Sequence, residues 1–454
     1  MSLALAKWIV VLGGLAAVYP AGWLLRTRPR AQRFLLVLIG LLPFLGVTHL
    51  SLNPISYETY RGDARGLEVT LLDFVIWVLA VALPPARFAS PYRRLRWIYF
   101  AVAAASMLTA PLPLFAFFGV WKLVRLYILI AVVARACEDD TVPPLLLRGL
   151  AIGVAFEGLV ALDQRYIRHF YQSLGTFPHP NSLAMACNLV APIAFSVVLF
   201  RERQRAALVA LAGGALCVIL ALSRGGMAMF ALAMVIVFAG SAARGITGRK
   251  FAVALAGLGA LLVAAFFYAS TLINRFENAP KESAESRILF KRAAAAMLAD
   301  HPFGIGMNQF SWVLEHLGYA QRIGIPGYDA SGIVHNIYWL TAAELGYVGL
   351  VAYLMLLWAP LATALFYAAL ARPDDIRGHV LLGCAAGFLV TYAQGTLEWL
   401  PRQTDFATIF WSLAAMTAAL SRGVRASAGV SDRDWARAML GHKLGGIALI
   451  SARR

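Results

Sequence analysis

The chain has 454 residues, of which 60% are hydrophobic and 14% charged, and its mean hydropathy is +0.71. Soluble proteins contain roughly 45–50% apolar and about 25% charged residues, so this composition excludes an ordinary soluble enzyme and a disordered chain. The net charge of +17 would favour nucleic-acid binding in a soluble protein. In a membrane protein, basic loops that fix the orientation explain the same excess, and no nucleic-acid partner is expected.

Apolar runs recur along the whole chain, each long enough to cross about 30 Å of hydrocarbon. In chain order we predict 13 of them, at 4–25, 34–52, 67–85, 95–111, 114–134, 143–162, 182–200, 206–223, 226–243, 251–271, 336–370, 379–398 and 406–420. Because the last run is short, 12 spans is the alternative. The first is too long for a signal-peptide core and no small-residue cleavage site follows it, so it is expected to be retained. The sequence therefore predicts an all-α polytopic membrane protein with one transmembrane domain over residues 1–454.

The numbers of Lys and Arg residues in alternate loops predict the orientation. One set of loops, together with the tail at 421–454, carries 25 of these residues, whereas the opposite set carries 13. The remaining two, Lys122 and Arg125, lie within a predicted span. The more basic side should be cytoplasmic, which places the carboxyl terminus inside and the amino terminus outside.

This orientation places a long loop at 272–334 on the outer face, and a loop of this length is usually functional. Within it, Glu282 to Ala299 has helical periodicity and predicts a helix that lies along the membrane interface. His301-Pro302 should end that helix, and Gly304 and Gly306 should form a turn.

Two short polar segments on the outer side flank spans. Gly175 to Ala184 contains His179 and Asn181, and two prolines that stiffen the entry to a span; helix capping is the simpler explanation. Ser223 to Gly226 places Arg224 at the edge of the hydrocarbon beside two glycines. Arg224 is either a snorkelling helix-end residue or a guanidinium group that binds phosphate oxygens.

Two more segments border the long loop. Glu285-Ser286-Arg287 is followed on the same predicted helix by Lys291 and Arg292, which form either a solvated face or a site for a lipid-linked diphosphate. His335 stands at the outer mouth of a span, followed by Asn336. An imidazole there could act as a general base near neutral pH, although a histidine at a helix end is more often only hydrogen-bonded.

Several kinds of site have no support in the sequence. It contains no P-loop motif, no H-E-x-x-H and no C-x-x-C, so neither a P-loop ATPase nor a zinc centre is indicated. The four cysteines show no paired spacing and predict no disulfide frame; they are Cys137, Cys187, Cys217 and Cys384. The D-x-D motif at Asp432 to Asp434 falls in the predicted cytoplasmic tail, away from the other polar segments.

Four motifs in this order resemble the O-antigen ligase and polymerase superfamily, and most closely an O-antigen ligase. They are Ser223-Arg224-Gly225, Glu285-Ser286-Arg287, Pro302-Phe303-Gly304-Ile305-Gly306 and His335-Asn336-Ile337-Tyr338. The resemblance covers residues 175–350, and the other spans match only in hydropathy and number. It implies a GT-C-like, inverting glycosyltransferase of the bacterial inner membrane with a periplasmic active site and neither metal nor cofactor.

The resemblance also implies substrates and residue roles. A glycan would pass from undecaprenyl diphosphate to an acceptor hydroxyl such as that of lipid A–core, with all lipid substrates entering from the membrane. His335 would be the catalytic base, and Arg224 and Arg287 would bind the donor diphosphate. Supporting residues would be Asn336, His179, Asn181, Lys291, Lys122 and Arg125, and Glu398 is a candidate to orient a cation or His335.

Other functions remain open at this stage. A repeat-unit polymerase shares the motifs and the length, whereas protein O-oligosaccharyltransferases generally carry a longer carboxyl-terminal region. A lipid or glycan transporter would use charges inside the spans as ion relays, and the candidates are Asp73, Lys122, Arg125, Glu157 and Glu344. The alternative explanation for these charges is that they pair with one another. A purely scaffolding role for the protein would not explain the arginine and histidine residues at the outer side.

Overall fold

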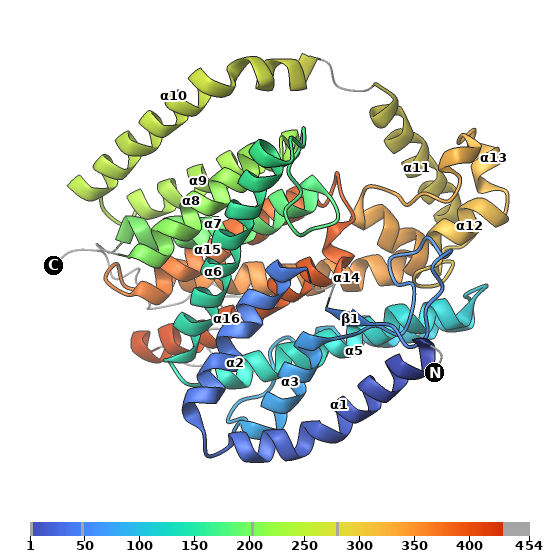
Figure 1. The fold of residues 1–454 in the computed structure, drawn as a ribbon, viewed down its shortest axis with the longest axis horizontal. Coiled ribbons are helices and arrows are strands. Elements are labelled where there is room, and N and C mark those ends of the chain that lie inside the picture. Colours follow the sequence, from blue (N-terminus) through green and yellow to red (C-terminus); the bar gives the residue numbers. More distant parts are fainter. Residues whose placement is uncertain (1–2, 47–49, 201–203, 278–280, 430–454) are drawn as a thin grey trace, which may run out of the picture.

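The computed structural model describes residues 3–46, 50–200, 204–277 and 281–429, and nearly all of its regular structure is helical (Figure 1). Thirteen helices correspond to the predicted runs: α1 (Leu3–Leu25), α2 (Pro29–Leu41), α3 (Leu71–Ala82), α4 (Arg93–Ala105), α5 (Pro113–Ala136), α6 (Val142–Leu162), α7 (Pro180–Phe200), α8 (Arg205–Leu220), α9 (Arg224–Ala242), α10 (Gly248–Glu277), α14 (Ile337–Leu370), α15 (Ile376–Gln394) and α16 (Thr404–Ala428). The prediction of an all-α polytopic membrane protein is confirmed.

Within the described residues, seven helices are long and apolar enough to cross a membrane, namely α1, α5, α6, α7, α9, α14 and α15. Helices α3 and α8 are apolar but shorter. The total of 12 or 13 spans therefore stays a prediction. All four cysteines are free and buried, in agreement with the absence of a disulfide frame.

One predicted run differs in its second half. Helix α2 ends at Leu41, a 3-10 turn covers Leu42–Leu45, and Gly46 adopts a left-handed conformation with φ of 71°. The chain then forms strand β1 (Ser51–Leu52), which pairs antiparallel with β2 (Val69–Thr70). Pro43 and Gly46 explain the early end of the helix, because proline removes a backbone donor and glycine readily takes a positive φ.

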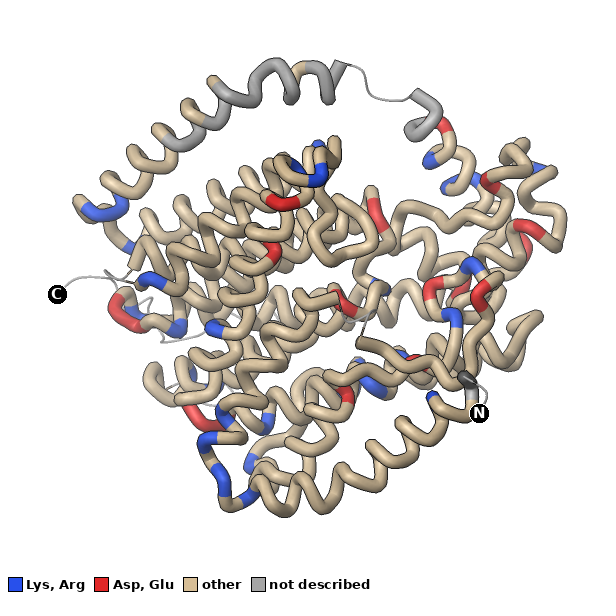
Figure 2. The backbone as a smooth tube through the Cα atoms, viewed as in Figure 1, with Lys and Arg blue, Asp and Glu red and all other residues tan. Residues whose placement is uncertain are grey.

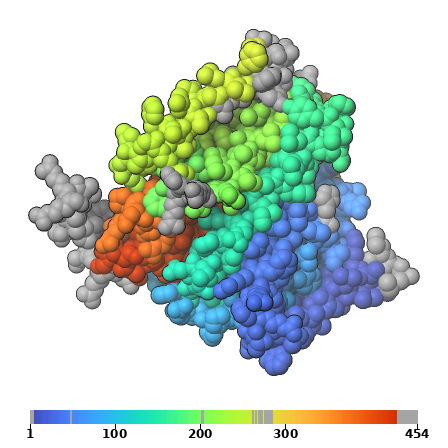
Figure 3. Space-filling model, turned by 60° about the vertical axis from the view of Figure 1, so that its left-hand side comes forward, coloured from blue at the N-terminus to red at the C-terminus, as the bar shows by residue number. Residues whose placement is uncertain are grey.

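Helix α7 is the centre of the bundle and is packed by α8, α9 and α15. Gly383 of α15 permits the closest of these approaches, because a Cβ atom there would lie 2.4 Å from the Cα of Ile193. Small residues at helix contacts are typical of membrane bundles. Helix α14 packs against α4, α15, α16 and α11 (Lys281–Asp300), whereas α10 follows the outside of the bundle (Figures 1 and 3).

Five turns rich in basic residues lie at one end of the bundle, at the left in Figure 2, and face the viewer in Figure 3. They join α1 to α2, α3 to α4, α5 to α6, α9 to α10 and α14 to α15. The starts of α7, α9 and α14 lie at the opposite end, which we call the outer end. The alternation used to predict orientation is thus present in the fold.

The long loop contains helices of its own. Helix α11 (Lys281–Asp300) confirms the helix predicted over 282–299, and it ends at His301-Pro302 as expected. The short helices α12 (Phe310–His316) and α13 (Tyr319–Ile323) follow, and a 3-10 turn covers Gly327–Asp329. Elsewhere, short turns of helix cover Ser106–Leu108, Asp163–Ile167 and Leu400–Arg402.

Helix α14 is broken at Gly346, where φ is 67° and ψ is −171°. The segment 302–306 inserts at this break. Its amides at Ile305 and Gly306 donate to the carbonyls of Ala343 and Glu344, and the Pro302 carbonyl accepts from Tyr347 N. A break in a membrane helix is tolerated when neighbouring groups satisfy the freed backbone atoms. The predicted Gly304–Gly306 turn is confirmed, and it serves this insertion.

We expect Gly304→Ala to destabilise the protein by at least about 1–3 kcal/mol, because an alanine there would be strained at its φ of +91°. The added Cβ would also lie 2.3 Å from the Glu344 carbonyl oxygen. Thermal unfolding of the purified protein measures this loss. Gly327→Ala is the control, because an added Cβ there has no described atom within 4 Å. Equal unfolding temperatures for the two variants would contradict the inserted turn.

Candidate active site

The carboxylate of Glu398 lies at the centre of the polar groups at the outer end. Its side chain is 5% exposed and follows α15 in the turn that leads to α16. Oε1 accepts from Asn181 Nδ2 at 2.5 Å and from Arg287 Nη2 at 3.2 Å, while Oε2 lies 3.2 Å from His335 Nδ1. One buried carboxylate therefore joins three of the residues predicted from the sequence.

His335 owes its position to the start of α14. Asn336 caps this helix, since its Oδ1 accepts from the amides of Tyr338 and Trp339, both at 3.0 Å. Asn336 Nδ2 donates to the Thr396 carbonyl at 2.8 Å, which fixes the cap to the turn that carries Glu398. The His335 side chain is 38% exposed, so its ring is held on one side and open to a ligand on the other.

Arg287 reaches the same carboxylate from α11. Its side chain is 33% exposed, so the ion pair with Glu398 leaves part of the guanidinium group accessible. Lys291 follows four residues later and shares that face of the helix. Arg292 is exposed on a different face. Helix α11 therefore presents Arg287 and Lys291 toward one side.

Arg224 is the first residue of α9, and Ser223 caps this helix by accepting from Gly226 N at 3.1 Å. The start of α9 lies close to the Glu398 turn, because a Cβ on Gly225 would be 3.7 Å from Leu397 Cδ1. Arg224 is half-buried and, among the described residues, has no hydrogen bond or ion pair. Its guanidinium group is therefore available to an anion at the outer end.

His179 and Asn181 approach Glu398 from the start of α7. His179 Nδ1 accepts from the Asn181 amide at 3.1 Å, so the proton of the neutral ring is on Nε2. Partial burial lowers the pKa of His179, and His335 and Arg287 lower it further, while Glu398 acts in the opposite direction. His179 is therefore neutral at pH 7 in this arrangement.

Glu157 of α6 holds the segment that carries His179 in place. Both carboxylate oxygens accept from Thr176, Oε1 from the hydroxyl at 2.5 Å and Oε2 from the amide at 3.0 Å. Gly175 allows this contact, because its φ is +63° and a Cβ there would lie 1.9 Å from Glu157 Oε2. Glu157 thus supports a loop of the site.

Lys122 and Arg125 lie deeper, on α5, in a group of paired charges. Lys122 Nζ is 3.4 Å from Asp63 Oδ2, and Arg125 pairs with Glu68 at 2.5 Å and Asp73 at 2.8 Å. Arg402 pairs with Glu344 in the same region. Pairing is therefore the structural explanation for most of the charges considered as ion relays.

A cavity of about 720 Å³ lies beside Lys122 and Arg125. Its wall includes Pro178 and Trp399, the neighbours of His179 and Glu398, as well as Lys122 and Arg125. Four basic and four acidic residues line it, and Trp121 and Phe118 add aromatic surface. We call this space the outer cavity. The outer cavity is nearly neutral in charge and has room for more than one six-membered ring.

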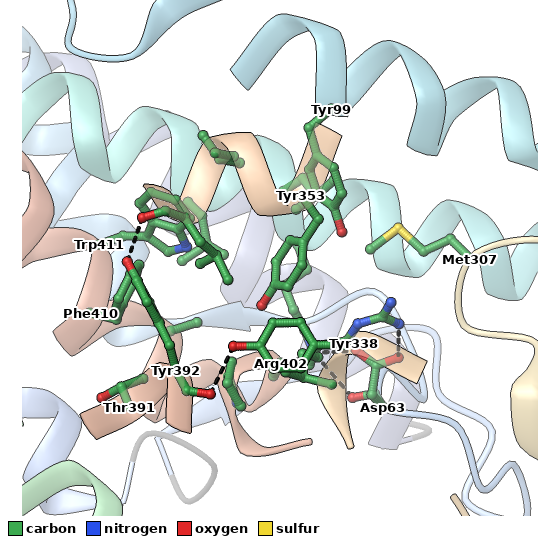
Figure 4. A pocket seen from close by; sticks show the side chains of 18 of the residues that line it. Asp63, Tyr99, Met307, Tyr338, Tyr353, Thr391, Tyr392, Arg402, Phe410 and Trp411 are labelled. Atoms are coloured by element: carbon green, nitrogen blue, oxygen red, sulfur yellow. Dashed lines mark hydrogen bonds and ion pairs between the residues drawn. The ribbon is translucent and has the colours of Figure 1, made fainter. Parts of the chain in front are cut away.

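A second pocket, behind Arg402, is packed with tyrosines and has a volume of about 60 Å³, enough for roughly two water molecules (Figure 4). Tyr338 donates to the Tyr392 carbonyl at 2.8 Å, and Tyr392 donates to the Leu357 carbonyl at 2.6 Å. These bonds hold α14 against α15 close to Asn336. The pocket is too small for a glycan and stabilises the helix ends that carry the site.

The sequence predicted most members of this site, but it did not show that Glu398 joins them. Asn181, Arg287 and His335 are separated from Glu398 by 217, 111 and 63 residues, so no local motif contains the contact. Mutual pairing was the predicted alternative for Asp73 and Arg125, which pair at 2.8 Å, whereas Asp63 and Glu68 were not predicted as partners. An acidic residue at the outer end of a span was the one available signal for Glu398.

Chemically, the arrangement offers a partly open imidazole, whose Nδ1 faces a buried carboxylate, beside two accessible guanidinium groups. Such a set can accept a proton and bind an anion. Within the described parts of the chain, no group of three or more His, Cys, Asp or Glu side chains has the spacing to hold a metal ion.

Residues 206–354 match the family model described as O-antigen ligase. The matched segment runs from α8 into α14 and contains Arg224, Arg287 and His335, whereas Glu398 lies outside it. No curated protein matches the chain significantly.

Proposed function

The match of residues 206–354 supports membership of the O-antigen ligase and polymerase superfamily, and on that premise we propose that this protein is a glycosyltransferase. It moves a glycan from undecaprenyl diphosphate to an acceptor hydroxyl at the periplasmic face of the bacterial inner membrane. The preferred reaction is ligation of O-antigen to lipid A–core, without a metal ion. The observation that carries the proposal is the Glu398 carboxylate, which holds both His335 and Arg287.

His335 is the proposed catalytic base. With Nδ1–H donated to Glu398, the lone pair of Nε2 is free to take the proton of the acceptor hydroxyl. The acceptor oxygen then bonds to the anomeric carbon, the bond from that carbon to the phosphate oxygen breaks, and undecaprenyl diphosphate leaves with the electron pair. Attack opposite the leaving group inverts the anomeric configuration.

Arg224 and Arg287 are the proposed diphosphate ligands. Negative charge grows on the leaving diphosphate as the sugar–oxygen bond breaks, and fixed guanidinium groups stabilise that charge. Arg224 has no competing carboxylate among the described residues, and Arg287 is held in place by Glu398 while part of it stays exposed. Lys291 adds a further cation on the same face of α11.

The outer cavity is the proposed place for sugar units next to the reacting carbon. Trp121 and Trp399 offer aromatic faces, and Asp63, Glu68 and Asp405 offer carboxylate oxygens, which suit the apolar faces and hydroxyls of sugars. Lys122 keeps the Asp63 carboxylate in position, and Arg125 does the same for Glu68. Their direct contact with the diphosphate stays a prediction.

Repeat-unit polymerisation is the second candidate reaction, because the same family includes polymerases. Ligation and polymerisation are distinguished by incubating the purified protein with undecaprenyl-diphosphate-linked glycan and lipid A–core. Gel electrophoresis then follows the glycan on each of the two lipids. Ligation predicts that glycan appears on lipid A–core. Growth of the glycan on its own carrier would identify a polymerase. Absence of both products from folded protein would contradict glycosyl transfer and favour transport.

Glu398→Gln should lower the turnover of glycan transfer by roughly 10²-fold, the lower range for loss of general base catalysis. The amide keeps the shape of the side chain but has only one acceptor oxygen for three partners, so His335 and Arg287 lose their common anchor. Initial rates at saturating donor and acceptor measure the effect. Glu315→Gln, an exposed change on α12, is the control. Full turnover by Glu398→Gln would contradict the positioning role of this carboxylate.

A further inference from the structure

A second large cavity lies at the basic end of the bundle, opposite the candidate active site. Its volume is about 510 Å³, and it is bounded by α4, α5, the turn between α3 and α4, and Arg422 of α16. Four arginines line it, Arg93, Arg96, Arg135 and Arg422, together with one acidic residue, Glu138. We call this space the basic cavity.

Among the described residues, the four arginines of the basic cavity form no ion pair, and Glu138 acts electrostatically on two of them, Arg135 and Arg422. Arg96 is 5% exposed, yet its three hydrogen bonds go to the carbonyls of Pro91 and Tyr127 and the hydroxyl of Ser90. Arg135 donates through Nη2 to the carbonyls of Leu79 and Ala80, and its buried Nε has no described partner. A buried cation without an anion is costly, so an anionic ligand here would be strongly favoured.

The one acidic residue of the cavity offsets only part of the charge of the four arginines. Both oxygens of Glu138 accept backbone amides, from Arg87 at 2.9 Å and from Phe88 at 3.1 Å. Its ion pair, at 3.7 Å, is with the exposed Arg87, which does not line the cavity. The basic cavity therefore keeps a clear excess of positive charge.

The remaining wall is apolar and partly open to the surroundings of the bundle. Trp97 and Phe88 are exposed, and Phe100 and Ile128 continue the apolar surface along α4 and α5. The site thus combines guanidinium groups with a surface suited to hydrocarbon chains. A free phosphate ion would use only the first of these, whereas a phospholipid would use both.

We propose that the basic cavity binds the phosphate headgroup of an anionic glycerophospholipid, whose acyl chains lie along Trp97 and Phe100. Basic pockets between membrane helices are the usual sites for such headgroups, and aromatic side chains favour the membrane interface. The bound lipid would join the ends of α3, α4, α5 and α16. This inference is independent of the glycosyltransferase activity.

The test uses the full-length protein purified in a zwitterionic detergent. Phosphatidylglycerol, phosphatidylcholine and inorganic phosphate are titrated separately, and bound lipid is measured by native mass spectrometry alongside thermal unfolding. We expect at least about tenfold tighter binding of phosphatidylglycerol than of phosphatidylcholine, with a rise in unfolding temperature for phosphatidylglycerol alone. Equal binding of the two lipids would overturn the proposal, as would equal stabilisation by phosphate.

Two substitutions in the basic cavity test whether phosphatidylglycerol binds there. Arg135→Gln and the exposed Arg93→Gln should each weaken phosphatidylglycerol binding by about tenfold, because each removes a cation that faces the headgroup. Arg148→Gln is the control, since Arg148 is exposed at the same end of the bundle but does not line the cavity. If all three variants bind phosphatidylglycerol as the wild type does, the lipid binds elsewhere and the proposal is wrong.

Discussion

His335→Ala should lower the rate of glycan transfer by about 10²–10⁴, the usual contribution of a general base. The acceptor hydroxyl is a poor nucleophile until its proton is removed, and His335 is the partly exposed imidazole that Glu398 holds at 3.2 Å. Initial rates with purified protein, undecaprenyl-diphosphate-linked glycan and lipid A–core measure the loss. Added imidazole should restore part of the rate to this variant, because the substitution leaves space for a free base.

The control for His335→Ala is His316→Ala. His316 is also in the outer region, but its ring stacks on Trp312 at 4.8 Å and is not part of the Glu398 group. We expect this variant to transfer glycan at the wild-type rate. If both variants were equally active, His335 would not be the base.

Arg287→Ala should lower the rate by about 10²–10³, as expected when one fixed donor to a developing charge is removed. Arg287→Lys should recover only part of the activity, because lysine keeps the charge but lacks the planar fork of donors that matches phosphate oxygens. Arg224→Ala should have an effect of similar size. Steady-state kinetics with varied donor concentration measure both the rate and the donor KM.

Arg292→Ala provides a matched control on the same helix, since Arg292 is exposed and is not paired with Glu398. Its loss removes the same charge from α11 without touching the site. Equal losses of activity from Arg287→Ala and Arg292→Ala would mean that α11 acts through its total charge. That result would contradict a specific diphosphate contact.

The helices were predictable because their apolar runs are long and continuous in the sequence. The same holds for α11, whose periodicity and terminal His301-Pro302 are local signals. The break of α14 at Gly346 was not predicted, because the hydropathy of 336–370 is uninterrupted. The groups that satisfy the break come from 302–306. These hydrogen bonds depend on tertiary packing and produce no periodic pattern in the sequence.

In the candidate site, too, single residues could be predicted from the sequence, whereas their contacts could not. Arg224 and His335 could be selected as polar residues at the mouths of spans, and Arg287 as part of a basic helix in the long loop, whereas their roles were implied by the resemblance. Their meeting at Glu398 could not be selected, since it depends on how α7, α11, α14 and α15 pack. Mutual pairing was a prediction for Asp73 and Arg125, but the pairing of Arg125 with Glu68 depends on the position of the loop before α3. Single-sequence patterns contain no information on that position.

Glycan transfer by the purified wild-type protein in the presence of EDTA, compared with transfer by His335→Ala under the same conditions, tests the proposed mechanism. The donor is undecaprenyl-diphosphate-linked glycan, the acceptor is lipid A–core, and the product is detected by mass spectrometry. The proposed mechanism predicts glycosylated lipid A–core from the wild type at an undiminished rate with EDTA, and a loss of about 10²–10⁴ in the rate of the variant. Wild-type product that disappears with EDTA, or equal product from both proteins, would contradict it.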